Sequence, residues 1–347
     1  MSRMPLLSVC YILIVFLGIL LKNHRTAYIV TITTMLTLIS GLRHIDIGLD
    51  TEVYYSLFEQ SKSFGIDIPL SRDLETGYLW FQMMFSKIFP SFHFFLLFIA
   101  VFFHVAFARV VHRYSPDPLW SYLFYYVLFF SFYGVTGLRQ TIAAALCLMA
   151  IPFIEKKKLI PFIILVMLAT SFHTIAIVFL PAYFLLQIKI SRPYLVIASI
   201  GIAIMMILQQ TILRQVTDFF VNLTGDEHYD SYGNTRFAIL NYAIYTFTLT
   251  LAAALFFRKT LKKFPKAKYF YNSMLIGCAL VITGLQRLTM FYSIGTCFVI
   301  PYVMDAFEDK RFLRFAQKIM IIALFFLHYK SITDIWLDRF IFFWQSW

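Results

Sequence analysis

Long apolar runs restrict the fold of this chain more than any other feature. Stretches such as LLSVCYILIVFLGILL, AYIVTITTMLTLISGL and LVIASIGIAIMMILQQTIL are each long enough to cross the core of a bilayer as a helix. Only helices and closed barrels satisfy their backbone hydrogen bonds in lipid, and uninterrupted apolar runs lack the alternation of barrel strands. The sequence therefore predicts an all-α polytopic integral membrane protein, a bundle of about 10–12 transmembrane helices that can include re-entrant or broken ones.

The amino-acid composition is typical of a protein surrounded by lipid. The chain is 60% hydrophobic and 14% charged, whereas soluble domains are about a quarter charged. We find no internal repeat, low-complexity linker or soluble domain. Residues 1–347 are therefore expected to form a single polytopic membrane domain.

Basic residues are concentrated in short loops between the apolar runs, and this distribution predicts the orientation. The net charge is +12, and the basic loops are residues 22–25, 109–113, 155–158, 189–192 and 258–268. Short basic loops mark the cytoplasmic side and suit anionic lipid headgroups, so no nucleic acid partner is needed to explain them. This orientation puts loops 43–75 and 215–237 outside, with 258–268 as a basic cytoplasmic loop. The opposite orientation at the N-terminus, with 43–75 inside, stays open.

Polar residues at the outer ends of the predicted spans are the candidates for function. They are Arg43, Asp46, Asp50, Glu75, Arg139, Gln140, His173 and Arg287. Charged groups at the edge of lipid cost free energy unless they pair or face water, and they are functional candidates by default. Each also has a structural explanation: Arg287 can reach the headgroups, Arg43 can pair with either aspartate, and His173 can bind a carbonyl where a helix pair breaks.

Taken together, these residues suit chemistry on a phosphate-bearing substrate. Converging arginines form an anion site, because guanidinium binds phosphate through two parallel hydrogen bonds. A nearby carboxylate can take the proton of an attacking hydroxyl, and a histidine suits acid–base work. The sequence has no Gly-rich nucleotide loop, Asp-x-Asp pair or His/Cys metal spacing, so we expect no metal and no cofactor.

Four motifs in order resemble a known family. They are R-x4-G-x-D-x3-Y at Arg43, Gly48, Asp50 and Tyr54; ETGY at 75–78; LRQTIAAAL with Arg139 and Gln140; and LATSFHTIAIVFLPAY with His173. They resemble the EpsG/Wzy-type polysaccharide (O-antigen) polymerases. Later positions are similar more loosely: Tyr229 and Tyr232 in HYDSYG, and Arg287 in QRLTMFY. Asp46 matches no position of the family.

The resemblance implies a membrane glycosyltransferase that uses lipid-linked donors. Such an enzyme joins undecaprenyl-diphosphate-linked oligosaccharide repeat units on the outer, periplasmic face of the plasma (inner) membrane. It makes O-antigen, capsular polysaccharide or exopolysaccharide by moving the growing chain from its lipid diphosphate to a sugar hydroxyl of the next unit. The lipid-linked oligosaccharide is then the substrate partner, and a chain-length regulator and a flippase in the same membrane are candidate protein partners.

The candidate site residues divide into three roles. For the diphosphate we predict Arg139 and Arg287, with Arg43 either joining them or positioning Asp50. Asp50 or Glu75 is the predicted general base, and His173 contacts phosphate or orients the base. The weaker sugar-binding candidates are Tyr54, Tyr78, Gln140, Tyr229 and Tyr232.

Two other functions use the same residue types. A lipid-linked oligosaccharide flippase also holds diphosphate, but such transporters often have duplicated halves, which are absent from this sequence. An O-antigen ligase shares the donor and differs in the acceptor, which sequence hardly resolves. A membrane acyltransferase is disfavoured, because it needs a histidine on the cytoplasmic side.

Overall fold

The structure is a computed structural model, and it is helical throughout the part of the chain that it describes. The described residues are 5–64, 74–207, 215, 218, 254–281, 286–307, 310–334 and 339–345. The candidates Tyr229 and Tyr232 lie outside these residues. The chain divides into two compact units. The first comprises Met1–Met149, Ser171–His173 and Phe307–Trp347, and the second comprises Ala150–Thr170 and Thr174–Ala306.

Four helices of the described part are long and apolar enough to cross a membrane. They cover Phe92–Tyr114, Leu138–Glu155, Arg287–Ala306 and Lys310–Thr333. Shorter apolar helices accompany them, at Leu6–Leu20, Leu159–Phe172, Thr174–Leu185 and Arg192–Ile202. The predicted fold class, an all-α polytopic membrane protein, is confirmed. The predicted number of spans and their orientation stay predictions.

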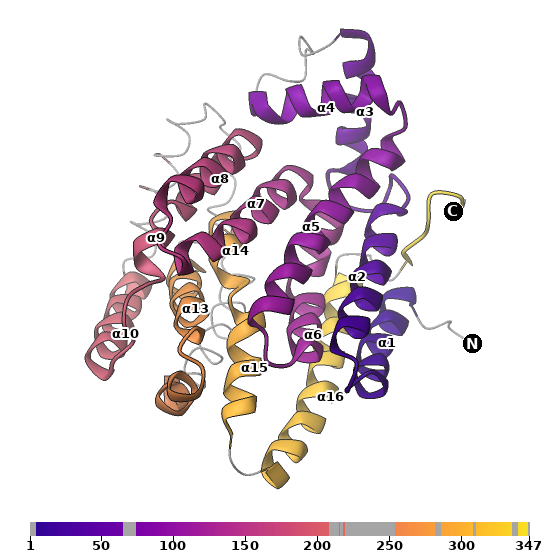
Figure 1. Ribbon diagram of the computed structural model, residues 1–347. Helices are drawn as coiled ribbons and strands as arrows, with labels where there is room; N and C mark the ends of the chain where they lie inside the picture. The colour runs from indigo at the N-terminus through magenta and orange to yellow at the C-terminus, as the bar shows by residue number, and fades with distance from the viewer. Residues whose placement is uncertain are drawn as a thin grey trace. The chain divides into compact units, whose positions relative to one another are not determined.

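In the first unit, long helices pack side by side and a helix pair lies at one end of them. The elements are α1 (Leu6–Leu20), α2 (Arg25–Gly41), α3 (Thr51–Phe64), α4 (Thr76–Ile88), α5 (Phe92–Tyr114), α6 (Pro118–Leu128), the π-helix η2 (Ser131–Thr136), α7 (Leu138–Glu155) and α16 (Lys310–Asp334). Helix α2 runs along α5, and α1 packs against α6 and α16, while α3 and α4 pair beyond the upper end of α5 (Figure 1). The α2–α5 contact is close at Gly41, where a β-carbon would lie 2.7 Å from the Leu97 Cα.

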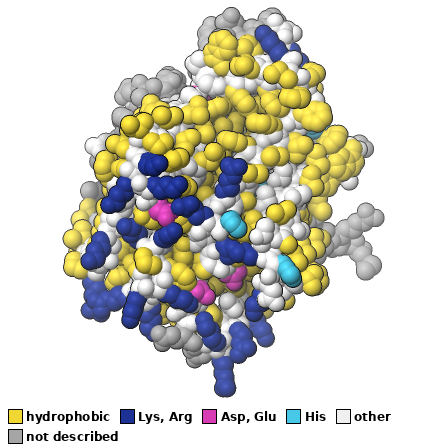
Figure 2. Space-filling view, viewed as in Figure 1, with side chains coloured by type: hydrophobic (Ala, Val, Ile, Leu, Met, Phe, Trp, Pro, Cys, Tyr) yellow, Lys and Arg dark blue, Asp and Glu magenta, His cyan; other side chains and the backbone are white. Residues whose placement is uncertain are grey.

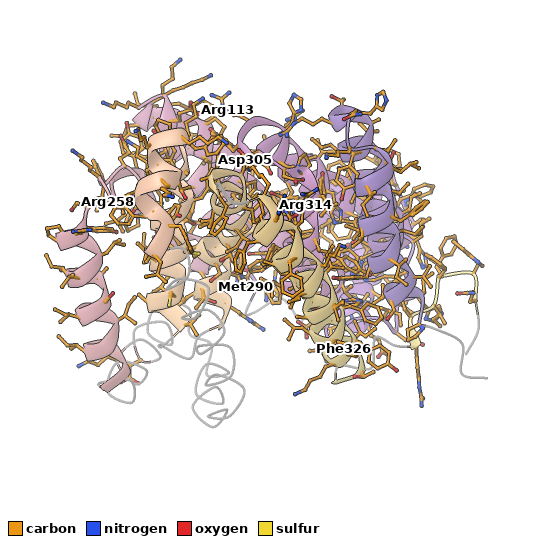
Figure 3. All side chains as sticks on the ribbon, turned by 90° about the horizontal axis from the view of Figure 1, so that it is seen from below. Arg113, Arg258, Met290, Asp305, Arg314 and Phe326 are labelled. Atoms are coloured by element: carbon orange, nitrogen blue, oxygen red, sulfur yellow. The ribbon has the colours of Figure 1, made fainter. Side chains whose placement is uncertain are left out.

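Helix α16 presents an apolar stripe at its surface. Its exposed large side chains follow a spacing of three and four residues, so they share one side of the helix: Phe312, Phe315, Ile319, Ile322 and Phe326. Phe326 and Arg314 lie along this helix in Figure 3. Apolar side chains also cover much of the face seen in Figure 2. A surface of this kind suits contact with lipid, as expected for a membrane-embedded protein.

The second unit contains shorter helices and one break. Its elements are α8 (Leu159–Phe172, whose last two residues belong to the first unit), the 3-10 helix η3 (Thr174–Phe179), α9 (Ala182–Leu185), α10 (Arg192–Ile207), a helix over 254–263, α13 (Ala267–Val281), α14 (Gln286–Ser293) and α15 (Thr296–Ala306). Helix α13 packs against α10, α14 and α15. A break near His173 was predicted from the short apolar run, and α8 does end at Phe172 before the 3-10 helix begins.

Two segments outside the long helices are more ordered than the sequence suggested. The predicted outer loop 43–75 contains helix α3, whose Leu57 and Phe58 are buried. The aromatic C-terminal tail pairs with the end of α2: Phe343 N donates to Leu42 O at 3.0 Å, and His44 N donates to Ile341 O at 3.0 Å. The tail therefore fixes the start of the loop that carries Asp50.

Candidate active site

Glu75 is the centre of a polar cluster in the first unit. It lies immediately before α4, and its side chain is 13% exposed. One carboxylate oxygen, Oε2, accepts a hydrogen bond from Nη1 of Arg139, and the other, Oε1, lies 3.0 Å from Nδ1 of His173. These residues come from three of the four sequence motifs, so folding joins segments that are 98 positions apart.

Arg139 connects the carboxylate to two tyrosines. Its Nε donates to the Tyr54 hydroxyl at 2.9 Å, and its guanidinium carbon lies 6.0 Å from the centre of that ring. The Tyr54 ring meets Tyr78 edge-to-face with 5.7 Å between ring centres. We call Glu75, Arg139, His173, Tyr54 and Tyr78 the Glu75 cluster. Its arginine is held by side chains that phosphate oxygens can replace, because guanidinium binds carboxylate and phosphate with the same geometry.

Gly77 explains how Glu75 reaches His173. A β-carbon at this glycine would lie 2.5 Å from both the backbone oxygen and the hydroxyl of Ser171. No larger residue fits without displacing backbone, so α4 approaches the end of α8 closely only because residue 77 is glycine. Glu75 is two residues before this contact and His173 is two residues after it. The glycine therefore sets the distance between the two functional groups.

The π-helix η2 directly precedes α7 and orients its first turn. Side chains bind the carbonyls of this wider helix: the Thr141 hydroxyl donates to Tyr133 O at 2.9 Å, and the Ser40 hydroxyl donates to Gly134 O. Single-turn π-helices are rare and occur frequently at functional sites. Here the π-helix ends at Thr136, three residues before Arg139, so it determines where that guanidinium points.

The loop with Asp50 packs on the same π-helix. Gly48 has φ +105°, and a β-carbon there would lie 2.7 Å from Val135 O. A left-handed backbone this close to another chain segment requires glycine. Asp50 precedes α3 and is half-buried, and its backbone oxygen accepts from Tyr54 N at 3.1 Å. The carboxylate of Asp50 thus lies one turn before the Tyr54 that binds Arg139, and among the described residues it forms no ion pair with the cluster.

Arg43 is buried in a different environment. Its side chain is 1% exposed. Nη1 donates to Ser40 O at 2.5 Å and Gly134 O at 3.5 Å, and Nε donates to Ile47 O at 3.3 Å. Burial lowers the pKa of Arg43 to about 9, so the guanidinium is still protonated at pH 7. Arg43 therefore joins the end of α2, the Asp50 loop and η2 through backbone carbonyls.

The ion pair that Arg43 could form with Asp46 or Asp50 does not occur among the described residues. Asp46 is exposed, and its Oδ2 lies 3.2 Å from Nδ1 of His44. Asp46 therefore takes no part in the Glu75 cluster.

The remaining candidates lie elsewhere. Gln140 is buried next to Arg139 in α7. Arg287 is the second residue of α14 in the second unit and is partly buried. Within the first unit the structure thus brings together Glu75, Arg139, His173, Tyr54 and Tyr78, and ties Arg43 to them through η2.

Comparison with known proteins identifies the family. The model of the EpsG family matches residues 26–341 of the 347. The chain belongs to the EpsG family. This match contains every residue of the Glu75 cluster, and EpsG membership implies a general function as a polysaccharide polymerase with glycosyltransferase-like activity. No curated protein matches the chain, and no solved structure does either.

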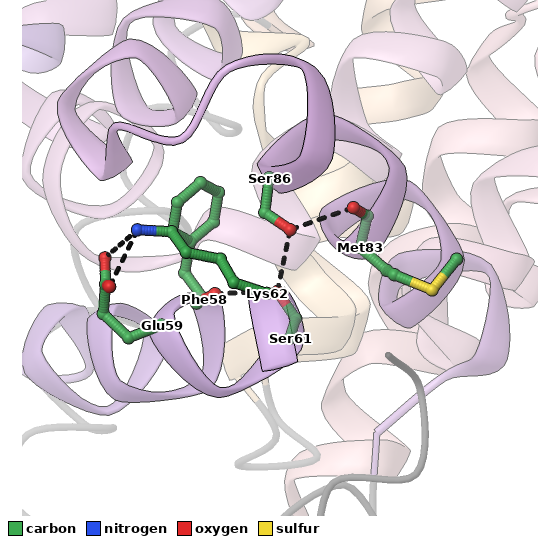
Figure 4. A network of polar contacts seen from close by, with 6 residues as sticks. All are labelled: Phe58, Glu59, Ser61, Lys62, Met83 and Ser86. Atoms are coloured by element: carbon green, nitrogen blue, oxygen red, sulfur yellow. Dashed lines mark hydrogen bonds and ion pairs between the residues drawn. The ribbon is translucent and has the colours of Figure 1, made fainter. Parts of the chain in front are cut away.

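Three polar residues of the first unit of this EpsG protein were missed by the sequence analysis. Gln82 and Ser86 in α4, and Ser61 in α3, are all buried. The Ser61 hydroxyl lies 2.7 Å from Phe58 O and 3.1 Å from the Ser86 hydroxyl, and the second contact joins the two helices (Figure 4). A signal was present in the sequence, since Gln82 and Ser86 follow Tyr78 at intervals of four residues and so share its side of the helix.

Proposed function

We propose that this protein polymerises undecaprenyl-diphosphate-linked oligosaccharide repeat units on the outer face of the plasma membrane. The growing chain leaves its lipid diphosphate and is transferred to a sugar hydroxyl of the next unit, giving O-antigen, capsular polysaccharide or exopolysaccharide. The observation that carries the proposal is that Arg139 and His173 share the carboxylate of Glu75. One buried cluster thus contains an anion-binding group, a proton acceptor and an orienting histidine.

The transfer breaks the bond between the anomeric carbon of the growing chain and the diphosphate oxygen. A new bond forms from that carbon to the acceptor oxygen, and the acceptor proton passes to Glu75. Negative charge develops on the departing diphosphate, where a preorganised cation lowers the barrier most. Arg139 supplies this cation, and Arg287 is the second candidate for the diphosphate.

Exchange of partners at Arg139 activates the base. While Arg139 is bound to Glu75, the positive charge disfavours protonation of the carboxylate. When diphosphate takes over the guanidinium, Glu75 keeps its contact with His173, loses the adjacent positive charge and becomes a better proton acceptor. Donor binding thus prepares the base for the acceptor hydroxyl. His173 orients the carboxylate through the 3.0 Å contact.

The other candidates have supporting roles in this scheme. Asp50 is the alternative base, one turn before Tyr54, and Arg43 positions the loop that carries it. Tyr54, Tyr78 and Gln140 border the sugar path, with Tyr229 and Tyr232 as further candidates. A flippase that delivers the lipid-linked unit and a chain-length regulator are the expected partners in the same membrane.

Purified protein in lipid nanodiscs, given lipid-linked repeat units alone, tests the proposal. Wild-type protein should produce a ladder of polymer, and Arg139→Ala should produce none at equal protein level. Arg314→Ala is the matched control, because Arg314 is exposed on α16 and its Nε binds only Lys310 O, at 3.1 Å.

Two results would contradict the proposal. A wild-type ladder from Arg139→Ala would remove the diphosphate role of this arginine. In proteoliposomes, movement of the lipid-linked unit across the bilayer without new glycosidic bonds would instead indicate a flippase.

A further inference from the structure

Helices α3 and α4 meet along a seam with polar contacts at both ends. On α4, Tyr78 and Ser86 are eight residues apart and lie on the same side, since residues four apart are neighbours on a helix. Tyr78 meets Tyr54 of α3 at one end, and Ser86 binds Ser61 of α3 at the other end. Gln82 lies midway between them on the same side of α4, so it also faces α3.

The middle of the seam has polar groups whose hydrogen bonds are not made. Gln82 and Tyr78 are both 0% exposed. Within the part of the chain that the structure describes, neither amide atom of Gln82 has a hydrogen-bond partner, and the Tyr78 hydroxyl has none. The α3 residues between Tyr54 and Ser61 include Leu57 and Phe58, both buried and apolar at their side chains. An amide enclosed there loses its bonds to water and gains none in return.

Three such atoms within one helical turn need an explanation, because buried polar groups in native proteins are nearly always hydrogen-bonded. The stretch begins three residues after Glu75, which immediately precedes the same helix. We propose that Gln82 and the Tyr78 hydroxyl form a binding site for the hydroxyl groups of a sugar residue of the lipid-linked substrate, and that α3 separates from α4 to admit it. This sugar site rests on the proposed function.

The chemistry of the two side chains fits a sugar. The amide of Gln82 has two donors and an acceptor, so it can bind two adjacent hydroxyl groups that each donate and accept. The Tyr78 hydroxyl adds a further donor and acceptor one turn closer to Glu75. A sugar bound there would place the acceptor hydroxyl toward the carboxylate that takes its proton.

The contacts along the seam indicate which end opens. The far end is held by the Ser61–Ser86 hydrogen bond, with Ser86 also donating to Met83 O at 2.9 Å and Lys62 bound to Glu59 beside it (Figure 4). At the near end, the contacts are the ring contact between Tyr54 and Tyr78, at 5.7 Å, and the hydrogen bond from Arg139 to Tyr54, and no direct hydrogen bond joins α3 to α4 there among the described residues. The far end therefore acts as the hinge. Opening also moves Tyr54, which binds Arg139, so entry of the sugar is linked to release of the guanidinium.

Binding measurements on the full-length protein in nanodiscs test this site. The probes are undecaprenyl diphosphate with its repeat unit and undecaprenyl diphosphate without sugar, measured by thermophoresis. Gln82→Leu and Tyr78→Phe should weaken binding of the sugar-bearing lipid by about tenfold, because a site built for hydroxyl groups loses its partner. Binding of the sugar-free lipid should be unchanged. The melting temperature of Gln82→Leu should not fall, since an amide without partners is replaced by an apolar side chain.

Ser86→Ala is the matched control on the same side of α4. It breaks the link to Ser61, so it should lower the melting temperature and leave the affinity of both lipids within twofold of wild type. Equal affinity of wild type and both variants for the sugar-bearing lipid would overturn the sugar site. A melting temperature of Gln82→Leu lowered as in Ser86→Ala, with unchanged affinities, would make Gln82 a packing residue and also overturn it.

The same measurements separate this inference from the proposed function. If wild-type protein binds both lipids but makes no polymer, the polymerase proposal fails, and a selective tenfold loss in the variants still supports the sugar site. If wild-type protein binds neither lipid, both proposals are wrong. Polymer from wild type with undiminished sugar binding in the variants leaves the polymerase and removes only the sugar site.

Discussion

Arg43 and Arg139 are two arginines of the first unit with opposite surroundings. Arg43 follows α2, and among the described residues its hydrogen bonds go to backbone carbonyls, those of Ser40, Ile47 and Gly134. Arg139 begins α7 and is held by the carboxylate of Glu75 and the hydroxyl of Tyr54. Both lie at helix ends near the π-helix η2, and both were predicted to bind diphosphate.

These surroundings indicate different roles: Arg43 holds the framework together, whereas Arg139 is placed to bind a ligand. Backbone carbonyls cannot leave without rearranging the chain, so the partners of Arg43 fix its position. Side chains such as Glu75 can rotate away when a phosphate competes for the guanidinium. A buried charge held by a single carboxylate is also expensive to leave without a partner, which favours exchange over simple loss.

The largest expected differences in activity and stability come from replacing each arginine in turn. Arg139→Met should reduce polymerisation by about a thousandfold, as expected when a preorganised cation is lost. Arg43→Met leaves buried carbonyls without donors and should lower the melting temperature by about 5 °C. Polymer ladders and thermal unfolding of the two variants in detergent measure both effects. If the two variants lose similar amounts of polymerisation activity and of melting temperature, the distinction between the two arginines is wrong.

Neutralising the shared carboxylate should have the next largest effect. Glu75→Gln keeps the shape of the side chain but removes its basicity and its pairing with Arg139 and His173. Initial rates of polymerisation should fall by about a hundredfold, the usual contribution of a general base. Glu59→Gln is the control, because that glutamate pairs with Lys62 at the surface. An unaffected rate in Glu75→Gln, together with a loss in Asp50→Asn, would move the base to Asp50.

A smaller loss of activity is expected when only the distance between Glu75 and His173 is changed. Gly77→Ala puts a β-carbon where Ser171 already lies, so it should move Glu75 away from His173 and lower kcat/KM on the order of tenfold. Gly201→Ala is the matched control: in the described part of the chain, no atom outside the local backbone of α10 lies within 4 Å of a β-carbon at Gly201. The kcat/KM of Gly77→Ala should therefore be lower than that of Gly201→Ala. Similar kcat/KM values would show that the close approach at Gly77 does not affect activity.

The smallest expected effect concerns the second partner of Arg139. Tyr54→Phe removes the hydroxyl that accepts from Nε, a net loss of about 1 kcal/mol, or about fivefold in kcat/KM. Tyr55→Phe is the neighbouring control, since the Tyr55 ring packs on Phe92 with 5.5 Å between centres. Rates for Tyr54→Phe equal to those of Tyr55→Phe would remove Tyr54 from the site.

The sequence singled out several of the residues that the structure brings together, although it did not predict their contacts. Arg139, His173 and Glu75 were singled out because charges at the ends of apolar helices need a reason. Their shared hydrogen bonds were not predictable, because they depend on how closely α4 approaches the end of α8. The ion pair of Arg43 with Asp46 or Asp50, which was the structural alternative for Arg43, does not occur among the described residues. The spacing along the chain allowed this ion pair. The loop turns at Gly48, however, and the guanidinium of Arg43 binds the backbone carbonyls of Ser40 and Ile47 instead.

Gln82 illustrates the opposite case. The sequence contained a polar residue in an apolar helix, one turn after Tyr78, and its four-residue spacing from Tyr78 was the only signal that pointed to it. Only the tertiary structure shows that its amide is fully buried and has no hydrogen-bond partners among the described residues.

The sequence by itself determined that this chain is a helical membrane protein of the EpsG family, because apolar run length and motif order are properties of the chain alone. The tertiary structure decided which polar residues meet. A carboxylate, a guanidinium and an imidazole become one cluster only when glycine lets two helices approach and a π-helix turns the next one. Such contacts depend on distances between distant segments, and those distances are set by packing.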